Sequence, residues 1–123
     1  MKIFEAIEEI DKLKPNLYGP NEKIKWLSRL DMKVQMEQID THEQEEPREA
    51  FKGYTDDDMD KQLLVGEPWD EMYIHWLSAQ IDFNNREFEN FNASNAMFES
   101  VYSSFRNAYN QSHMPIGTKK TYY

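Results

Sequence analysis

A run of carboxylates is the part of the sequence with the most obvious capacity for chemistry. Asp56, Asp58 and Asp60 alternate along the chain, and Glu67 follows them. In the register of an EF-hand calcium loop these residues take positions one, three, five and twelve, which supply oxygen ligands to the ion. Position six of such a loop needs a glycine for its sharp turn, and here it is Lys61. We therefore expect a solvated acidic loop at this point and not a calcium site.

Other catalytic and metal-binding patterns are also missing. Glu71 and His75 stand four residues apart, but di-metal bundles need a Glu-x-x-His motif on each of two helices. The chain has no cysteine and only four glycines, and it contains no phosphate-binding loop and no nucleophile elbow. We expect Asp82 to lie on ordinary helical surface near Arg86. The sequence thus predicts a protein that is not an enzyme and that needs no cofactor and no metal.

The charge of the chain is concentrated in one segment. The net charge is −9, and residues 40–71 hold 12 acidic and three basic residues, so the remainder is neutral. Conventional nucleic-acid binding requires a basic patch, and this distribution argues against it. The lack of cysteine, of a signal peptide and of any apolar run near the roughly 20 residues of a membrane span favours a cytoplasmic origin with no membrane partner.

Apolar periodicity predicts the elements that must position these side chains. Helical spacing is found over residues 3–13, 21–38, 69–91 and 96–111, with a break at 92–95. Asn21 is expected to cap the second helix, and Ser94 or Asn95 the last one. The fold class is therefore all-α, a small bundle of three to four helices with a long acidic loop at 40–68 between helices 2 and 3. Residues 63–65 are compatible with a short strand inside that loop.

The chain divides into a single helical domain at 1–111 and an extended C-terminal tail at 112–123. The third helix is apolar around more than half of its circumference, so we expect it to be central and to contact several neighbours. Gln80, Asn84 and Glu87 fall within its broad apolar face. Buried polar groups must be hydrogen-bonded. These three residues are expected to form a structural polar network with the turn at 92–95 or to contact a neighbouring subunit; the alternative is a helix edge partly in water.

The segment from Asp60 to Asn92 carries a family resemblance. Its distinctive parts are Leu63-Leu64-Val65, Pro68-Trp69-Asp70, Tyr73 and Leu77-Ser78-Ala79-Gln80-Ile81-Asp82, followed by an Asn/Glu-rich helix end. Phe105-Arg106-Asn107-Ala108-Tyr109 and the earlier Leu30-Asp31-Met32-Lys33-Val34 extend the pattern over about residues 24–112. This pattern resembles the head–tail connector (adaptor) proteins of tailed bacteriophages and of prophages in Gram-positive hosts.

The resemblance implies a structural virion protein located in the neck, present in the host cytoplasm during assembly. Such connectors are small helical proteins that assemble as a ring under the portal protein. They extend the DNA channel and present a platform for the neck and tail completion proteins, while DNA only passes through. The free protein is then compatible with a monomer. The alternative from another class is an acidic phage-encoded protein that mimics DNA and inhibits a host protein.

The C-terminal tail has the composition of a docking arm. Pro115 ends helicity, and the residues beyond it combine apolar anchors with two cations. Aromatic residues beside a cation suit a protein interface. We expect the tail to bind the portal protein through Ile116, Lys119, Lys120, Tyr122 and Tyr123; the alternative is a frayed terminus with no docking role.

Overall fold

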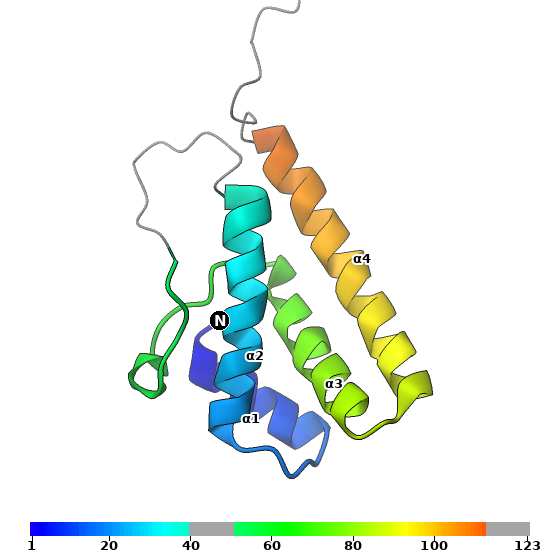
Figure 1. The fold of residues 1–123 in the computed structure, drawn as a ribbon. Helices are drawn as coiled ribbons and strands as arrows, with labels where there is room; N and C mark the ends of the chain where they lie inside the picture. The colour runs from blue at the N-terminus through cyan, green and yellow to red at the C-terminus, as the bar shows by residue number, and fades with distance from the viewer. Residues whose placement is uncertain (40–50, 113–123) are drawn as a thin grey trace, which may run out of the picture.

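Four α-helices form a bundle in the computed structural model, which describes residues 1–39 and 51–112 (Figure 1). They are α1 (Ile3–Leu13), α2 (Pro20–Val34), α3 (Met72–Asn84) and α4 (Phe88–Ser112). A π-helical turn, Gln35–Ile39, continues α2, and 3-10 turns lie at Asp56–Asp58 and Trp69–Glu71. The described ranges contain no β-strand. The predicted all-α class is therefore confirmed.

The first two helices follow the sequence pattern closely. The bounds of α1 are those that the apolar spacing predicts, and its buried face is formed by Ile3, Ala6, Ile7 and Ile10. The start of α2 differs from the prediction, because Gly19 is the N-cap residue and Pro20 opens the helix. Proline suits the first helical position, since its missing N–H would have no intrahelical partner there. Asn21 therefore lies inside α2 and does not cap it.

The break between the last two helices is at residues 85–87, so the prediction of a break at 92–95 is wrong. Arg86 adopts a left-handed conformation with φ of 60°. Its N–H donates to the Phe83 carbonyl at 3.0 Å, and the N–H of Glu87 donates to the Asp82 carbonyl at 2.9 Å. These two bonds form a Schellman motif, which satisfies the last carbonyls of α3. Ser94 and Asn95 consequently lie within α4.

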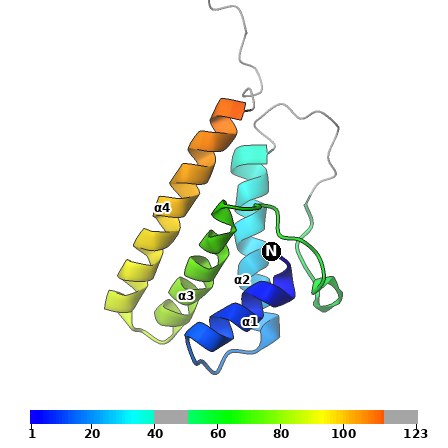
Figure 2. The same ribbon diagram turned by 180° about the vertical axis from the view of Figure 1, so that it is seen from behind.

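The α3 helix is central, as its apolar character predicts. It contacts α4 most extensively and also packs on α1 and α2. Met72, Tyr73, Leu77 and Ile81 are fully buried. Both views show α3 and α4 side by side as an antiparallel hairpin (Figures 1 and 2).

The chain before α3 packs along the N-terminus without forming a strand. The N–H of Ile3 donates to the Lys61 carbonyl at 3.0 Å, and the N–H of Leu63 donates to the Met1 carbonyl at 2.9 Å. Only an isolated antiparallel bridge, Lys2 with Gln62, results within the described ranges. Residues 63–65 are therefore not a strand, although Leu63 and Val65 are buried. Residues 40–50 of the predicted acidic loop lie outside the described part of the chain.

Candidate docking surfaces

A buried carboxylate anchors the segment after residue 51 to the bundle. Asp31 of α2 is fully buried. One carboxylate oxygen accepts a hydrogen bond from the Tyr73 hydroxyl at 2.6 Å, and the other accepts from the Leu64 N–H at 3.1 Å. The Tyr54 hydroxyl also donates to this second oxygen. Asp31 thus ties α2 to α3 and to two points of the segment between them.

Burial dominates the electrostatics of this cluster. Desolvation raises the pKa of Asp31 above its usual value, although the hydrogen bonds from Tyr54, Tyr73 and Leu64 oppose the shift. Burial and the nearby Asp31 carboxylate raise the pKa of both tyrosines. No cation lies against Asp31 in the described residues, so hydrogen-bond donors alone stabilise the carboxylate. The arrangement therefore holds α2, α3 and the segment between them in place, and it leaves no carboxylate or hydroxyl group free to react.

A second buried carboxylate fixes α1 against the α3–α4 hairpin. Asp82 is 0% exposed, so its predicted place on the helical surface is wrong. The Lys14 ammonium lies 2.5 Å from one of its oxygens, and the Ser94 hydroxyl donates to the other at 3.0 Å. Ser94 in turn lies 3.0 Å from the Ser78 hydroxyl. Ser94, one of the residues that suggested a turn there, therefore serves an interhelical contact.

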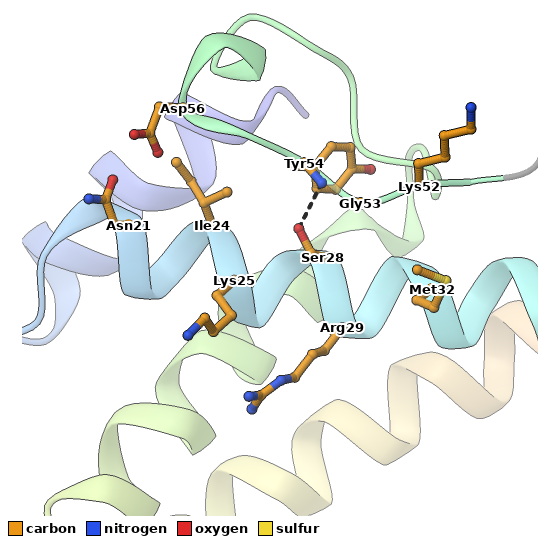
Figure 3. Close-up of a pocket in the computed structure, with 10 residues that line it drawn as sticks. All are labelled: Asn21, Ile24, Lys25, Ser28, Arg29, Met32, Lys52, Gly53, Tyr54 and Asp56. Atoms are coloured by element: carbon orange, nitrogen blue, oxygen red, sulfur yellow. Dashed lines mark hydrogen bonds between the residues drawn. The ribbon is translucent and has the colours of Figure 1, made fainter.

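A groove of about 530 Å³ runs along the outer face of α2 (Figure 3). The segment of residues 52–56 forms its other wall. The two walls are joined where the Tyr54 N–H donates to the Ser28 hydroxyl at 2.9 Å. Gly53 adopts a φ of +92° beside Ser28, a conformation that glycine accepts without strain. The groove is thus built by a turn locked onto the helix.

Three cations line this groove. They are Lys25, Arg29 and Lys52, and Asp56 is the single acid among the lining residues. All three cationic side chains are exposed, and none makes an ion pair within residues 1–39 and 51–112. Figure 3 shows Lys25 and Arg29 leaving α2 on the side away from Tyr54. The strongly acidic protein therefore presents a locally basic face, which we call the basic groove.

A second groove, formed mainly by α1, is acidic. This groove of about 610 Å³ follows the outer side of α1 and is lined by five acids, one lysine and three apolar residues: Glu5, Glu8, Glu9, Glu67, Asp70, Lys12, Met1, Phe4 and Leu13. We call this surface the acidic groove. α2 covers α1 in Figure 1, whereas α1 lies in front of α2 in Figure 2. The two grooves share no lining residue: α2 and residues 52–56 form the basic groove, and α1 with Met1, Glu67 and Asp70 forms the acidic groove.

Large apolar side chains gather at one end of the bundle. Leu13, Leu17, Phe83 and Phe88 are exposed by 66%, 102%, 53% and 54%. The Phe83 ring contacts that of Phe88, with centroids 6.1 Å apart. The hydrogen bond of 2.7 Å from the Tyr18 hydroxyl to Asn85, together with the Lys14–Asp82 pair, holds the α1–α2 connection against the α3–α4 turn. We call these four residues the apolar end.

The residues of the predicted polar network, Gln80, Asn84 and Glu87, make local contacts in the structure. Gln80 is half-buried, and its backbone carbonyl accepts a hydrogen bond from the Asn84 amide at 2.8 Å. Glu87 is exposed and accepts from Asn90 at 2.9 Å. Their role in a subunit contact stays a prediction. The predicted tail residues, Ile116, Lys119, Lys120, Tyr122 and Tyr123, lie outside the described residues.

The acidic run also has a structural use. The Asp58 carboxylate accepts hydrogen bonds from the Thr55 N–H at 2.7 Å and from its hydroxyl at 3.2 Å, which caps the 3-10 turn. The backbone bond to Thr55 and the nearby Lys61 lower the pKa of Asp58. In the ranges described, no cluster of three or more His, Cys, Asp or Glu side chains is arranged to hold a metal ion. Nor does any helix there have the length and apolar character to cross a membrane.

Comparison of the chain with protein-family models, with curated proteins and with solved structures finds no match.

Proposed function

We propose that this chain is a structural virion protein of the head–tail connector type. In this proposal it docks under the portal protein as a ring, extends the DNA channel and joins the neck and tail completion proteins. It acts by binding other proteins and catalyses no reaction.

The observation that carries the proposal is the position of the apolar end. A connector must bind one component above and another below. α4 begins at the turn beside the apolar end and finishes at Ser112, the last residue that the structure describes. A 25-residue helix is about 37 Å long. The apolar end and the start of the tail are therefore separated by the length of the bundle (Figure 1).

Exposed aromatic and aliphatic side chains at a helix turn suit a protein contact. Phe83 and Phe88 are each about half exposed, and Leu17 makes no burying contact at all. Several large apolar side chains exposed at one end of a domain mark an interaction site. We assign the apolar end to the next neck or tail component, and the C-terminal tail to the portal protein.

The residues that resemble the connector family are mainly those that build the fold. Leu63, Val65, Tyr73, Leu77 and Ile81 are all buried. Asp31, from the earlier part of the resembling pattern, anchors Tyr73 and Leu64. The resemblance therefore concerns architectural positions, which supports a structural role.

We further propose that residues 40–68 act as a long acidic loop beside the DNA channel. Negative charge repels the DNA backbone and so favours sliding over binding. Asp56 and Asp57 are exposed in the described part of this loop.

Electron microscopy of the full chain mixed with purified portal rings tests this function. The expected result is an additional ring of density below the portal. Deletion of residues 113–123 should abolish this density while the truncated chain stays folded. A truncated chain that still decorates the portal would assign portal docking to another surface. Absence of any portal-bound density with the full chain would contradict the connector function itself.

The acidic groove favours a second candidate, in which the protein mimics DNA. Glu5, Glu8 and Glu9 project from one side of α1, and Glu67 and Asp70 join them. Such clustered carboxylates can occupy a nucleic-acid-binding site on a host protein. Displacement of duplex DNA from a host DNA-binding protein by the purified chain would support this candidate. The basic groove favours the connector, because a DNA mimic needs no basic surface.

A further inference from the structure

We propose that the basic groove on α2 receives the acidic α1 face of a second copy of this chain. The contact is head-to-tail and repeats around the ring, so this inference rests on the proposed connector function. It names the surfaces through which neighbouring subunits bind.

Charge complementarity is the first argument. Lys25, Arg29 and Lys52 carry positive charge that no ion pair in the described residues neutralises. The acidic groove presents Glu8 and Glu67, which likewise have no described cationic partner. Electrostatic potentials of opposite sign on two surfaces steer the two proteins together and fix how they align. In a protein of net charge −9, the lining of this groove carries three cations and a single acid, Asp56, which favours an acidic partner.

Apolar surface accompanies the charges on both sides. Met32 lines the basic groove and is 37% exposed. Phe4 and Leu13 line the acidic groove, and Leu13 is 66% exposed. A protein interface typically combines an apolar centre with a polar rim. The stems of Lys25 and Arg29 add to this apolar surface, because long cationic side chains pack their methylenes while the charge reaches outward.

The placement of the two grooves determines the symmetry of the contact. They are two different patches, because no residue that lines the basic groove also lines the acidic groove. Two different patches that bind each other form a heterologous interface. Such an interface closes into a ring when the rotation that relates neighbouring subunits is a whole-number fraction of a full turn. A twofold dimer would need one self-complementary patch. Each groove alone carries mainly one sign of charge and would repel itself.

Complementary charge reversal tests the contact. The first variant, K25E/R29E, makes the basic groove acidic, and the second, E8K/E9K, makes the acidic groove basic. All four positions are exposed, so both variants should fold, which thermal unfolding of each will check. Sedimentation velocity of the full-length chains at high concentration is the measurement. Each variant alone should associate about tenfold or more weakly than the wild type, because like charges then face each other.

An equimolar mixture of the two variants should restore association. Every junction in the mixture then joins an acidic surface on one variant to a basic surface on the other. A mixture that stays dissociated, or single variants that associate like the wild type, would overturn the proposal. So would loss of duplex-DNA binding by K25E/R29E with self-association unchanged, since the groove would then be a nucleic-acid site.

Portal decoration separates this inference from the proposed function. If the variants and their mixture all bind portal rings with wild-type occupancy and order, the connector function stands and the groove contact is wrong. If the mixture restores association but no form of the chain binds a portal, the contact stands and the connector function is wrong.

Discussion

The Tyr73 hydroxyl donates a hydrogen bond to Asp31 at 2.6 Å and accepts one from the Val65 N–H at 2.9 Å. A single side chain on α3 therefore connects the carboxylate of α2 to the backbone of the preceding segment. Because the Leu64 N–H also donates to Asp31, the two consecutive amides are both held by this cluster. The basic groove depends on the same anchor, since Tyr54 donates to Asp31 through its hydroxyl and to Ser28 through its N–H.

Replacement of Asp31, the buried carboxylate that anchors Tyr54, Leu64 and Tyr73, should destabilise the protein strongly. Asp31→Asn keeps the size of the side chain but turns one acceptor into a donor, so one of the buried donors around it loses its partner. A buried donor without a partner costs about 1–3 kcal/mol, and loss of a charged acceptor adds to this, so we expect a loss of about 2–4 kcal/mol in urea unfolding at pH 7. The exposed Asp57→Asn is the matched control and should stay within about 0.5 kcal/mol of the wild type. Equal stability of both variants would contradict the anchor role.

The same variant should change how stability depends on pH. Burial raises the pKa of Asp31 in the folded state above its value in the unfolded chain. The folded protein then binds the proton more tightly, so this group's contribution is fully present below the unfolded pKa and is lost as pH rises through the folded pKa. The wild type should therefore exceed Asp31→Asn in free energy of unfolding by more at pH 4 than at pH 7. An advantage that grows with pH would show that the hydrogen bonds outweigh burial.

Tyrosine ionisation should report unfolding at alkaline pH. Burial raises the pKa of Tyr73 well above its usual value, and it raises that of Tyr102 to about 12. These groups stabilise the fold below the unfolded value near 10, and that contribution is lost as pH rises through the folded values. Absorbance at 295 nm should therefore rise in a late step that coincides with loss of helical circular dichroism. Tyr73→Phe should reduce the amplitude of that step, whereas an unchanged amplitude would place Tyr73 in solvent.

Most helices could be predicted because their apolar residues recur with helical spacing. The bounds of α1 follow from this spacing alone. The anchor also left a signal in the sequence: Asp31 stands four residues after Leu27 and seven after Ile24, within the apolar stripe of α2. An acid on a buried stripe must find partners. Tyr54 and Tyr73 could not be identified as those partners, because tertiary packing brings them to Asp31.

The α3–α4 break and the basic groove were beyond what local pattern can predict. The run at residues 92–95 is rich in turn-forming residues, yet the chain turns at Arg86, a residue that rarely adopts positive φ. Packing of Ser94 against Asp82 and Ser78 makes the helix the better state for that run. The basic groove joins residues 21–32 to residues 52–56, and only the fold brings these ranges together.

Glycine at the turn between α3 and α4 should stabilise the hairpin. Arg86 occupies the left-handed position of the Schellman motif, which costs a side-chain-bearing residue about 1 kcal/mol that glycine avoids. Glycine also gains freedom in the unfolded chain, so Arg86→Gly should raise the free energy of unfolding by only about 0.5 kcal/mol. Ala93→Gly is the control, since Ala93 is exposed within α4, and it should be destabilising because glycine is a poorer helix former than alanine. If the control variant had a higher free energy of unfolding than Arg86→Gly, this turn geometry would be wrong.

The ion pair between α1 and α3 should show strong coupling. The side chain of Asp82 is 1% exposed and that of Lys14 is 28% exposed. Removal of Lys14 leaves a buried carboxylate without its cation, and partial access to water limits the loss, so Lys14→Met should cost about 2–3 kcal/mol. Lys14→Met combined with Asp82→Leu should cost much less than the sum of the single changes. Additive losses in this double-mutant cycle would show that the two residues act independently.

The apolar end should bind a partner without contributing to the fold. Leu17 is fully exposed, and Phe88 is half exposed at the first residue of α4. An acid at Phe88 places negative charge at a helix N-terminus, which is favourable there. Leu17→Asp combined with Phe88→Asp should therefore change the unfolding free energy by less than about 1 kcal/mol. The same variant should still decorate portal rings but should no longer recruit the next neck component.

A matched variant distinguishes this end from exposed apolar surface in general. Met36 is 62% exposed and lies in the turn that continues the far end of α2. Met36→Asp removes a comparable exposed apolar group away from the apolar end, so it should leave recruitment unchanged. The readout is co-sedimentation of neck proteins with portal-bound complexes. If the Leu17/Phe88 variant still recruits neck proteins, the apolar end is not the docking surface. If Met36→Asp abolishes recruitment equally, the location of the exposed apolar side chains at the α3–α4 turn makes no difference, and the apolar end is again not the docking surface.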